Sequence, residues 1–285
     1  MTQISSTDGN LLLRLLRAEA ELLKKPIQFS EYTVIIVSEG QGTFYADFGR
    51  FDFKGPILLF ATPMQLIYIE TEIPLSYDVL HFHSDFYCIE YHREEVACNG
   101  LLFNNIYIAP SVSLTPSEKS GFTQITDQIA GELALASPSD IVLKSLLQLF
   151  LARSSQVKNK EMETTASVMI RDTEMEHFKE LLEARFLELR KPSDYAGLLR
   201  MTPNNFTKRC TRYFRKTPSQ LITERLILEA KKELHLTRKS IKEIAYALNF
   251  EDEFYFSRVF KKQTNESPQS FRDKTGISIV ADLYR

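Results

Sequence analysis

Two histidines spaced one residue apart, His81 and His83, form the pair whose spacing is most suggestive of site chemistry. In a strand, residues i and i+2 point to the same face, so the two imidazoles would lie together as metal ligands do. Cys88 stands where a glutamate would complete such a site, Glu90 comes later, and His92 follows nearby. We therefore expect these histidines to line a pocket or to hydrogen-bond locally, and we expect no metal and no other cofactor.

Residues with hydrogen-bonding and cationic side chains make a second set near the C-terminus. Over 203–214, Phe206, Cys210 and Phe214 recur at four-residue steps and define the buried face of a predicted helix. The opposite face would carry short polar and basic side chains suited to base edges and phosphates. These residues are Asn204, Asn205, Thr207, Lys208, Thr211 and Arg212.

The same arrangement occurs again about fifty residues later. Asp252 is a good N-cap for a helix whose buried face would carry Phe256, Val259 and Phe260. Its outward face would hold Glu253, Phe254, Ser257, Arg258 and Lys261. Phe254 has two interpretations, contact with a thymine methyl or packing inside the domain.

Short helices before these two segments complete the predicted motif. Residues 194–200 precede the first, and 241–248 precede the second; a helix at 219–236 joins them. Thr202 fits an N-cap and Pro203 the first helical turn. Two helix-turn-helix units on one rigid chain can reach successive major-groove turns of one DNA face. Between Lys191 and Arg272 there are 17 Lys and Arg against 9 Asp and Glu, as a polyanion partner requires.

The N-terminal half is predicted to be mainly β-structure. Short apolar runs at 32–37, 42–45, 57–60, 66–69 and 77–82 read as strands separated by turns. They predict a small β-barrel over about 28–110. Apolar periodicity at 122–130 and 141–151 predicts two helices, which pack on the barrel or form a dimer interface. Residues 154–167 lack periodicity and resemble a linker.

Composition limits the class of protein. A chain of 285 residues with 44% hydrophobic and 25% charged residues fits two soluble domains. The three cysteines have no zinc spacing, and the start has neither a signal peptide nor a membrane span. We expect a cytoplasmic protein with no membrane partner. No motif for phosphotransfer, nucleotide binding or hydrolysis stands out, so we do not expect an enzyme.

The stretch from Ser240 to Lys262, continued by Ser267-Pro268 and Phe271-Arg272, closely resembles the signature of the AraC/XylS family of regulators. Upstream, residues 217–222 and 225–234 are similar to the end of the family's first unit and its linker helix. The resemblance covers residues 195–272. The sequence departs from it at Arg215, Asn249 and Asn265, where glycine is usual, and at Cys210, where a large apolar residue is common.

The resemblance implies a multi-domain α+β protein. Residues 1–153 would form a cupin-like effector-binding and dimerisation domain, with the barrel at 28–110 and helices at 117–153. Residues 154–173 would be a linker, and 174–285 an all-α domain with two helix-turn-helix units. The implied function is sequence-specific transcription regulation on double-stranded DNA, as a homodimer, with RNA polymerase as a partner if the protein activates.

Control by a small effector in the barrel is the implied mode of regulation. Aromatic residues and the histidine pair would line its site, although barrel cores use the same aromatic residues. These residues are Tyr45, Phe60, Tyr68, His81 and His83. Two alternatives remain: an effector-independent DNA-binding protein whose barrel only dimerises, and a metal-dependent cupin enzyme fused to a DNA-targeting domain.

Overall fold

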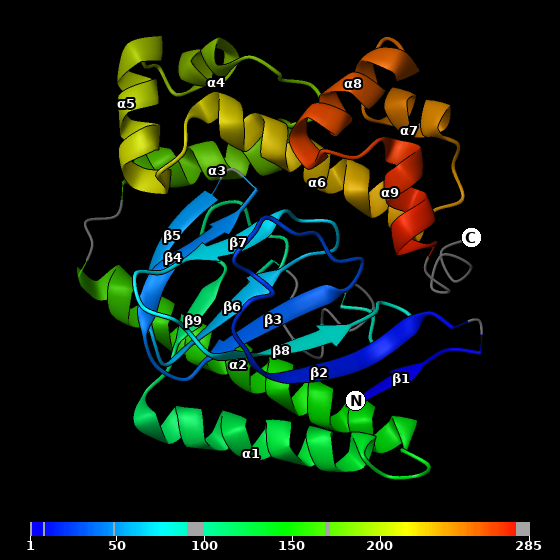
Figure 1. Cartoon of the computed structure of the whole chain (residues 1–285). Coiled ribbons are helices and arrows are strands. Elements are labelled where there is room, and N and C mark those ends of the chain that lie inside the picture. Colours follow the sequence, from blue (N-terminus) through cyan, green and yellow to red (C-terminus); the bar gives the residue numbers. More distant parts are fainter. Residues whose placement is uncertain (1, 8, 48, 90–99, 169–171, 278–285) are drawn as a thin grey trace. The chain divides into compact units, whose positions relative to one another are not determined.

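The structure is a computed structural model of the whole chain (Figure 1). It describes residues 2–7, 9–47, 49–89, 100–168 and 172–277, and the side chains of 165–168 are left undescribed. The chain forms two compact units. One comprises Met1–Asn105 and Ala109–Thr164, and the other Ile106–Ile108 and Thr165–Arg285.

Two antiparallel sheets form the first unit. The larger has the order β1-β2-β8-β3-β6-β9, and the smaller has the order β5-β4-β7. The strands of the larger sheet are β1 (Thr2–Ser5), β2 (Leu11–Glu19), β3 (Tyr32–Val37), β6 (Ile57–Ala61), β8 (Tyr77–Phe82) and β9 (Ser111–Ser113). Those of the smaller sheet are β4 (Gln41–Ala46), β5 (Gly49–Lys54) and β7 (Ile67–Glu70).

The predicted strands are confirmed, but the predicted barrel is not closed. One hydrophobic cluster lies between the sheets, and it joins Ile35 and Val79 of the larger sheet to Phe44 and Ile67 of the smaller. The larger sheet is widened by β2, a strand that the sequence analysis does not predict because its leucines and its two arginines, three residues apart, show no two-residue alternation and it has no β-branched residues. Since the smaller sheet has only three strands, it cannot cover the full width of the larger one.

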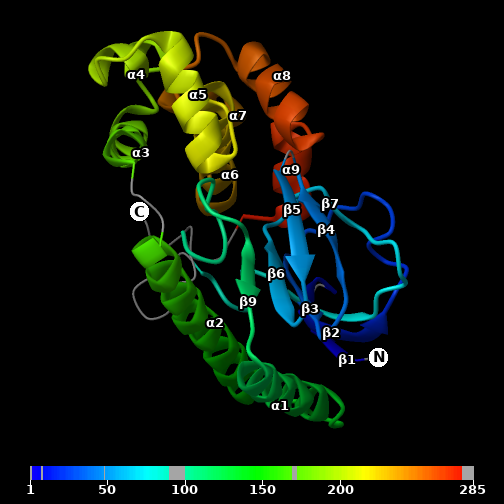
Figure 2. The ribbon, with the colours of Figure 1, turned by 90° about the vertical axis from the view of Figure 1, so that its left-hand side faces the viewer.

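Helices α1 (Pro116–Leu133) and α2 (Asp140–Val168) cover the other face of the larger sheet (Figures 1 and 2). Phe60 and Phe82 from the sheet share a cluster with Phe122 and Phe150 from the helices. Packing on the sheet, one of the two predicted roles of the helix pair, is therefore confirmed. The same pair also leaves Ile141 78% exposed.

The expected linker at 154–167 is instead the continuation of α2. Ser154 and Lys158 are buried on the face turned to the sheet. The Ser154 hydroxyl donates to the Phe150 carbonyl at 2.8 Å, and the Lys158 ammonium donates to the Ser111 carbonyl at 2.7 Å. These polar groups are satisfied while buried, so the stretch packs without the apolar periodicity that sequence analysis relies on.

The second unit is helical. Its elements are α3 (Thr173–Arg185), α4 (Pro192–Leu198), α5 (Pro203–Phe214), α6 (Pro218–Leu236), α7 (Ile241–Ala247), α8 (Glu253–Thr264) and α9 (Pro268–Thr275). The pair α4–α5 lies beside one end of α6 and the pair α7–α8 beside the other (Figure 1). Among the described residues, no helix is long and apolar enough to cross a membrane.

Candidate nucleic-acid interface

Two helix pairs in the second unit have the same local geometry. Each turn is closed by a backbone hydrogen bond, from Met201 to Ala196 at 2.8 Å and from Phe250 to Ala245 at 2.9 Å. Each following helix is capped, because Thr202 accepts from the Asn205 N–H and Asp252 from the Tyr255 N–H. The predicted N-caps of α5 and α8 are therefore confirmed.

The repeat extends beyond the helix pairs. Helices α5 and α8 both end on a residue with a left-handed backbone, Arg215 with φ 58° and Asn265 with φ 60°. Each is followed by a capped proline start, at Thr217-Pro218 for α6 and Ser267-Pro268 for α9. The turns also contain left-handed residues, Arg200 and Asn249. A structural repeat of this length indicates two copies of one DNA-binding motif rather than two unrelated hairpins.

Helix α5 separates its buried and exposed faces as predicted. Phe206, Cys210 and Phe214 are buried. The outward residues predicted for this helix are all exposed: Asn204, Asn205, Thr207, Lys208, Thr211 and Arg212. The Thr207 hydroxyl donates to the Pro203 carbonyl at 2.9 Å, which leaves its oxygen lone pairs as acceptors for a ligand.

Helix α8 buries Phe256 and Phe260, whereas Val259, predicted to face inward, is only half-buried. Arg258 and Lys261 are exposed, and Glu253 and Ser257 are half-buried. Phe254 is 73% exposed, which excludes packing inside this unit as its role.

Three further exposed residues near α8 are missing from the sequence analysis. Tyr255 and Lys262 belong to α8, and Tyr246 belongs to α7. The Arg258 guanidinium lies 5.8 Å from the Tyr255 ring centroid, within range of a cation–π interaction. The three-four spacing of Phe254, Arg258 and Lys261 places Tyr255 and Lys262 beside them, and that spacing is the signal that could have identified both.

The first helix pair is anchored to α3 by ion pairs. Arg209 on α5 donates to Asp172 at 2.5 and 3.0 Å and to Glu174 at 2.7 Å. Asp172 is also the N-cap of α3, accepting from the Met175 N–H. Burial acts to raise the pKa of Asp172, but the hydrogen bonds from Arg209 and Met175 outweigh it and lower that pKa.

Arg225 holds the connecting helix in place. Its guanidinium donates to Glu183 at 2.8 Å and to Glu229 at 3.0 Å, and it lies over the Phe186 ring at 3.9 Å. Although burial acts to lower the pKa of Arg225, these carboxylates raise it. The side chain is committed to packing inside the unit and is not part of the exposed basic surface.

The five predicted effector residues do not meet in one cavity. Tyr45 and Tyr68 stack at 4.3 Å on the smaller sheet, where the Tyr45 hydroxyl donates to Glu70 at 2.7 Å. Phe60 belongs to the cluster shared with the helices. His81 is fully buried on the other face of the larger sheet, and the Nδ1 atom of His83 lies 3.4 Å from Asp85. The five residues therefore lie in separate local environments, one of which Tyr45 and Tyr68 share.

The described part of the chain has no side-chain cluster suited to a metal ion. No group of three or more His, Cys, Asp or Glu side chains there is arranged to hold an ion. His81 Nδ1 is within hydrogen-bond distance of the Thr33 hydroxyl, at 3.0 Å. Glu90 and His92, which the sequence analysis placed near the pair, lie outside the described residues.

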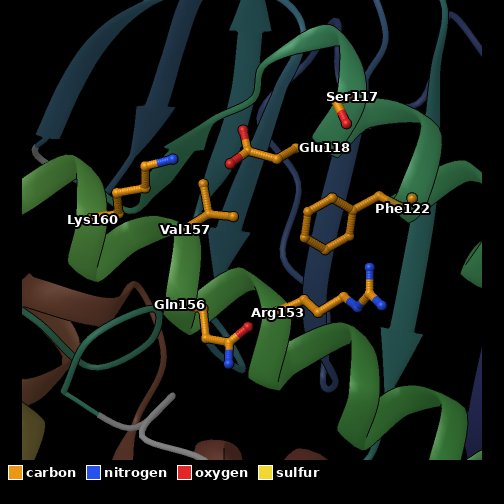
Figure 3. Close-up of a pocket in the computed structure, with 8 residues that line it drawn as sticks. Ser117, Glu118, Phe122, Arg153, Gln156, Val157 and Lys160 are labelled. Atoms are coloured by element: carbon orange, nitrogen blue, oxygen red, sulfur yellow. The ribbon is translucent and has the colours of Figure 1, made fainter.

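Described residues of the first unit line a groove and a smaller hollow. A groove of about 1320 Å³ is lined by the connections β3–β4 and β7–β8, with Phe53 among its apolar residues and Glu39 and Glu72 among its acidic ones. A smaller hollow of about 370 Å³ lies between α1 and α2, where Arg153 and Lys160 flank Glu118 (Figure 3). The Glu118 carboxylate accepts from the Thr115 N–H in a capping box, so it is already committed to the start of α1.

Comparison with known proteins identifies the helical unit. Residues 195–274 match a family model described as a helix-turn-helix domain. The chain is 33% identical over 61 residues to the raffinose operon transcriptional regulatory protein RafR of Pediococcus pentosaceus, a match covering 21% of this chain and only 22% of that protein. It is 23% identical over 251 residues to the arabinose operon regulatory protein of Salmonella typhimurium, covering 88% and 86% of the two chains.

Solved structures with a similar chain course include apo ToxT from Vibrio cholerae. That match covers 93% of this chain and 97% of ToxT, with 15% identity and a TM-score of 0.43. The C-terminal domain of the response regulator YesN from Fusobacterium nucleatum matches 34% of this chain and 95% of its own, with 22% identity and a TM-score of 0.33.

Proposed function

We propose how this chain, which belongs to the AraC/XylS family of transcription regulators, reads its DNA and is controlled. The protein is a DNA-binding transcription regulator. In our proposal, α5 and α8 act as recognition helices that enter two successive major grooves on one face of the double helix. The single observation that carries this proposal is the repeated geometry of α4–α5 and α7–α8, with matching caps and matching left-handed ends.

The first recognition helix would read bases mainly through short polar side chains. Asn204, Thr207 and Lys208 lie near its start on the exposed face, where a helix approaches base edges. Thr211 and Arg212 lie further along and would contact the phosphate backbone. Asn205 is exposed beside them and belongs to the same surface.

The second recognition helix would combine apolar and cationic contacts. Phe254, exposed at its start, suits a thymine methyl, and Arg258 suits guanine or phosphate. Glu253 would accept from a cytosine amine, Ser257 lies beside it, and Lys261 would neutralise a phosphate. The two helices would thus read different chemical features of their half-sites.

Control is proposed to come from the β-rich unit through a small effector. Both curated relatives are operon regulators by name, of raffinose and arabinose operons. The division of roles would follow the two compact units, with effector binding and dimerisation in the first and DNA binding in the second. The protein would act in the cytoplasm, and RNA polymerase would be a partner if it activates.

Dimerisation would use the exposed surface of α2. Ile141 is 78% exposed, and Val142 and Leu149 are exposed on the same helix, although the helix buries its opposite face on the sheet. Exposed apolar side chains that cluster on one helix are typical of protein interfaces. The α1–α2 pair would then serve both predicted roles, packing on its own sheet and pairing with a second copy.

The DNA-reading proposal is tested by electrophoretic mobility shift on the protein's own upstream intergenic DNA. Wild type at physiological salt with excess competitor is compared with an Arg258→Ala, Lys208→Ala double variant. An Arg153→Ala, Lys160→Ala double variant is the matched control, since it removes the same charge from exposed positions on α2. We expect sharp binding that only the first variant loses.

Two other outcomes are informative. Weak, salt-sensitive binding that both variants lose equally would indicate backbone attraction without base reading and would contradict the proposed role of the recognition helices. Operator affinity that no metabolite alters would instead support the effector-independent alternative, in which the first unit only dimerises.

A further inference from the structure

A row of polar side chains crosses the larger sheet on the face turned away from α1 and α2. Arg14 on β2 is the cross-strand partner of His81 on β8, and His81 is the partner of Thr33 on β3. The flanking residues Leu80 and Phe82 pack toward the helices, so His81 points to the opposite side. His81 is fully buried there, and the Phe29 ring lies over it at 4.5 Å.

The hydrogen bonds of the row fix the proton on His81. The Thr33 hydroxyl donates to the Glu31 carbonyl at 3.4 Å, so its oxygen is left to accept from His81 Nδ1–H at 3.0 Å. This assigns the proton to Nδ1 from the network, and Nε2 carries a lone pair. Nε2 is buried, and within the described residues it has no hydrogen-bond partner.

Arg14 is the second unsatisfied member of the row. Its Nε–H is buried and has no hydrogen-bond partner among the described residues. Arg17, three residues along the same strand, shows the usual arrangement, since it pairs with Asp78 at 2.8 Å and Asp127 at 2.7 Å. Burial, with a smaller contribution from Arg14, lowers the pKa of His81 to about 3.

Buried polar atoms without partners are costly and rare in native proteins, so each calls for an explanation, such as a bound water or ion. Arg14 and His81 are partners across neighbouring strands. Among the described residues, the Arg14 Nε–H has no acceptor and the His81 Nε2 lone pair has no donor. We propose that Arg14 and His81 bind the anionic group of the effector, an oxyanion such as a carboxylate or a phosphate. This inference rests on the effector control proposed above and names the chemical class of that effector.

The chemistry of such a site follows from the two side chains. The Arg14 guanidinium would donate to two oxygens of the anion, the geometry for which its planar fork is suited. His81 Nε2 would take a proton from solvent as the anion arrives, because a nearby negative charge favours the imidazolium. The imidazolium would then donate to the anion while Nδ1–H keeps its bond to Thr33. Binding is therefore coupled to the uptake of a proton.

The groups around His81 make this uptake specific to an anion. Arg14 is the charged group that acts on the ring, and it disfavours protonation. Thr33 from β3 and Phe29 from the segment between β2 and β3 are uncharged. Without an anion the ring stays neutral at physiological pH.

The inference is tested with the full chain by isothermal titration calorimetry at constant ionic strength. The probes are acetate, octanoate and inorganic phosphate, with octanamide as the uncharged match for octanoate. We expect binding of at least one anion, no binding of octanamide, and a loss of affinity of at least tenfold in Arg14→Gln. Arg50→Gln, which removes an exposed arginine of the smaller sheet, should change affinity less than twofold.

Long-range ¹⁵N spectra of the imidazoles supply a readout that a merely structural role would not move. The His81 signal, assigned by its absence in His81→Gln, should show the Nδ1–H neutral form in the free protein and a doubly protonated ring with the anion. Whichever probe binds, carboxylate or phosphate, identifies the source of the oxyanion. Absence of binding by all three anions, or equal binding by Arg14→Gln, would overturn the inference.

This test is independent of DNA recognition. Anion binding that depends on Arg14 in a protein without operator affinity would leave the site standing while the proposed function fails. Operator binding by wild type and Arg14→Gln alike, without anion binding by either, would overturn the site alone.

Discussion

The two helix-turn-helix units share one backbone plan but differ in how each is supported. Arg209 on α5 bonds to Asp172 and Glu174, whereas Val259 occupies the equivalent position on α8 and is half-buried. The buried Cys210 of α5 corresponds to the buried Phe260 of α8. The α4–α5 pair thus has ion pairs to the start of α3 and a smaller residue at this core position, whereas the α7–α8 pair has an aromatic ring there.

The exposed faces differ as well. The start of α5 presents Asn204 and Asn205, and the equivalent positions of α8 present Phe254 and Tyr255. Because the two helix pairs fold alike despite these substitutions, caps and left-handed ends specify the motif, while both the core and the exposed face can change. Four predictions test how far this separation holds.

The largest effect is expected in the core. Phe260→Ala should destabilise the protein by about 3–5 kcal/mol, because it removes a fully buried aromatic ring. Cys210→Ala at the equivalent position should cost only about 1 kcal/mol, a typical value for a small change. Urea unfolding followed by circular dichroism measures both, and equal costs would contradict a core difference between the units.

The second prediction concerns base reading. Arg258→Ala should weaken operator binding by about 1–3 kcal/mol and relax the preference at one base pair of the second half-site. Lys208→Ala should affect only the first half-site. Binding to a set of operators with single base-pair changes measures both effects. Uniform weakening across all operators in either variant would place that side chain on phosphate instead.

The third prediction concerns the pH dependence of the ion pair between Asp172 and Arg209. The folded-state pKa of Asp172 is lowered, so its contribution to stability is present above its unfolded pKa of about 3.9 and is lost as pH falls through the folded value. Asp172→Asn should therefore cost about 1–2 kcal/mol at pH 7 and less at pH 3, which lies below the unfolded pKa.

Unfolding at both pH values measures this effect. The control is Asp252→Asn, the N-cap of α8, which has no arginine partner corresponding to Arg209. If Asp172→Asn lowered the free energy of unfolding equally at pH 3 and pH 7, the charge of the carboxylate would not be what holds α5 to the start of α3.

The smallest effect is expected at the helix ends. Arg215→Gly should stabilise the protein by up to about 1 kcal/mol, because a left-handed backbone costs non-glycine residues roughly 1–2 kcal/mol. Asn265→Gly should change stability less, since asparagine tolerates this conformation. Thermal unfolding compares the two, and a loss of stability in Arg215→Gly would mean that the arginine side chain makes a compensating contact.

Much of the helical unit could be predicted from sequence. Thr202, Asp252 and the prolines that begin helices are local signals, and so is the four-residue spacing of Phe206, Cys210 and Phe214. Local signals are sufficient because the motif is built from contacts close in sequence. Exposure of Phe254 could not be predicted, because an aromatic residue at a helix start fits either a core or a surface.

The β-rich unit was harder to predict because its key pairings are distant in sequence. Strand β2 pairs with β8 about sixty to seventy residues away, and its consecutive leucines and spaced arginines do not show an alternation of apolar residues. The histidine pair drew attention for metal binding, yet the informative neighbour of His81 is Arg14, which only the register of the sheet reveals. Sequence spacing within one strand says nothing about its partner across the ladder.

The connecting helix α6 has a consequence for how operators evolve. It is one uninterrupted helix of 19 residues, roughly 28 Å long, with a buried face along its length. In the proposed mode of DNA reading, it fixes the angular phase between the two recognition helices. A substituted base would lower affinity in small steps, whereas one inserted base pair would rotate the second half-site by about 35°. During evolution, operators should therefore tolerate base substitutions far better than insertions or deletions between the two half-sites.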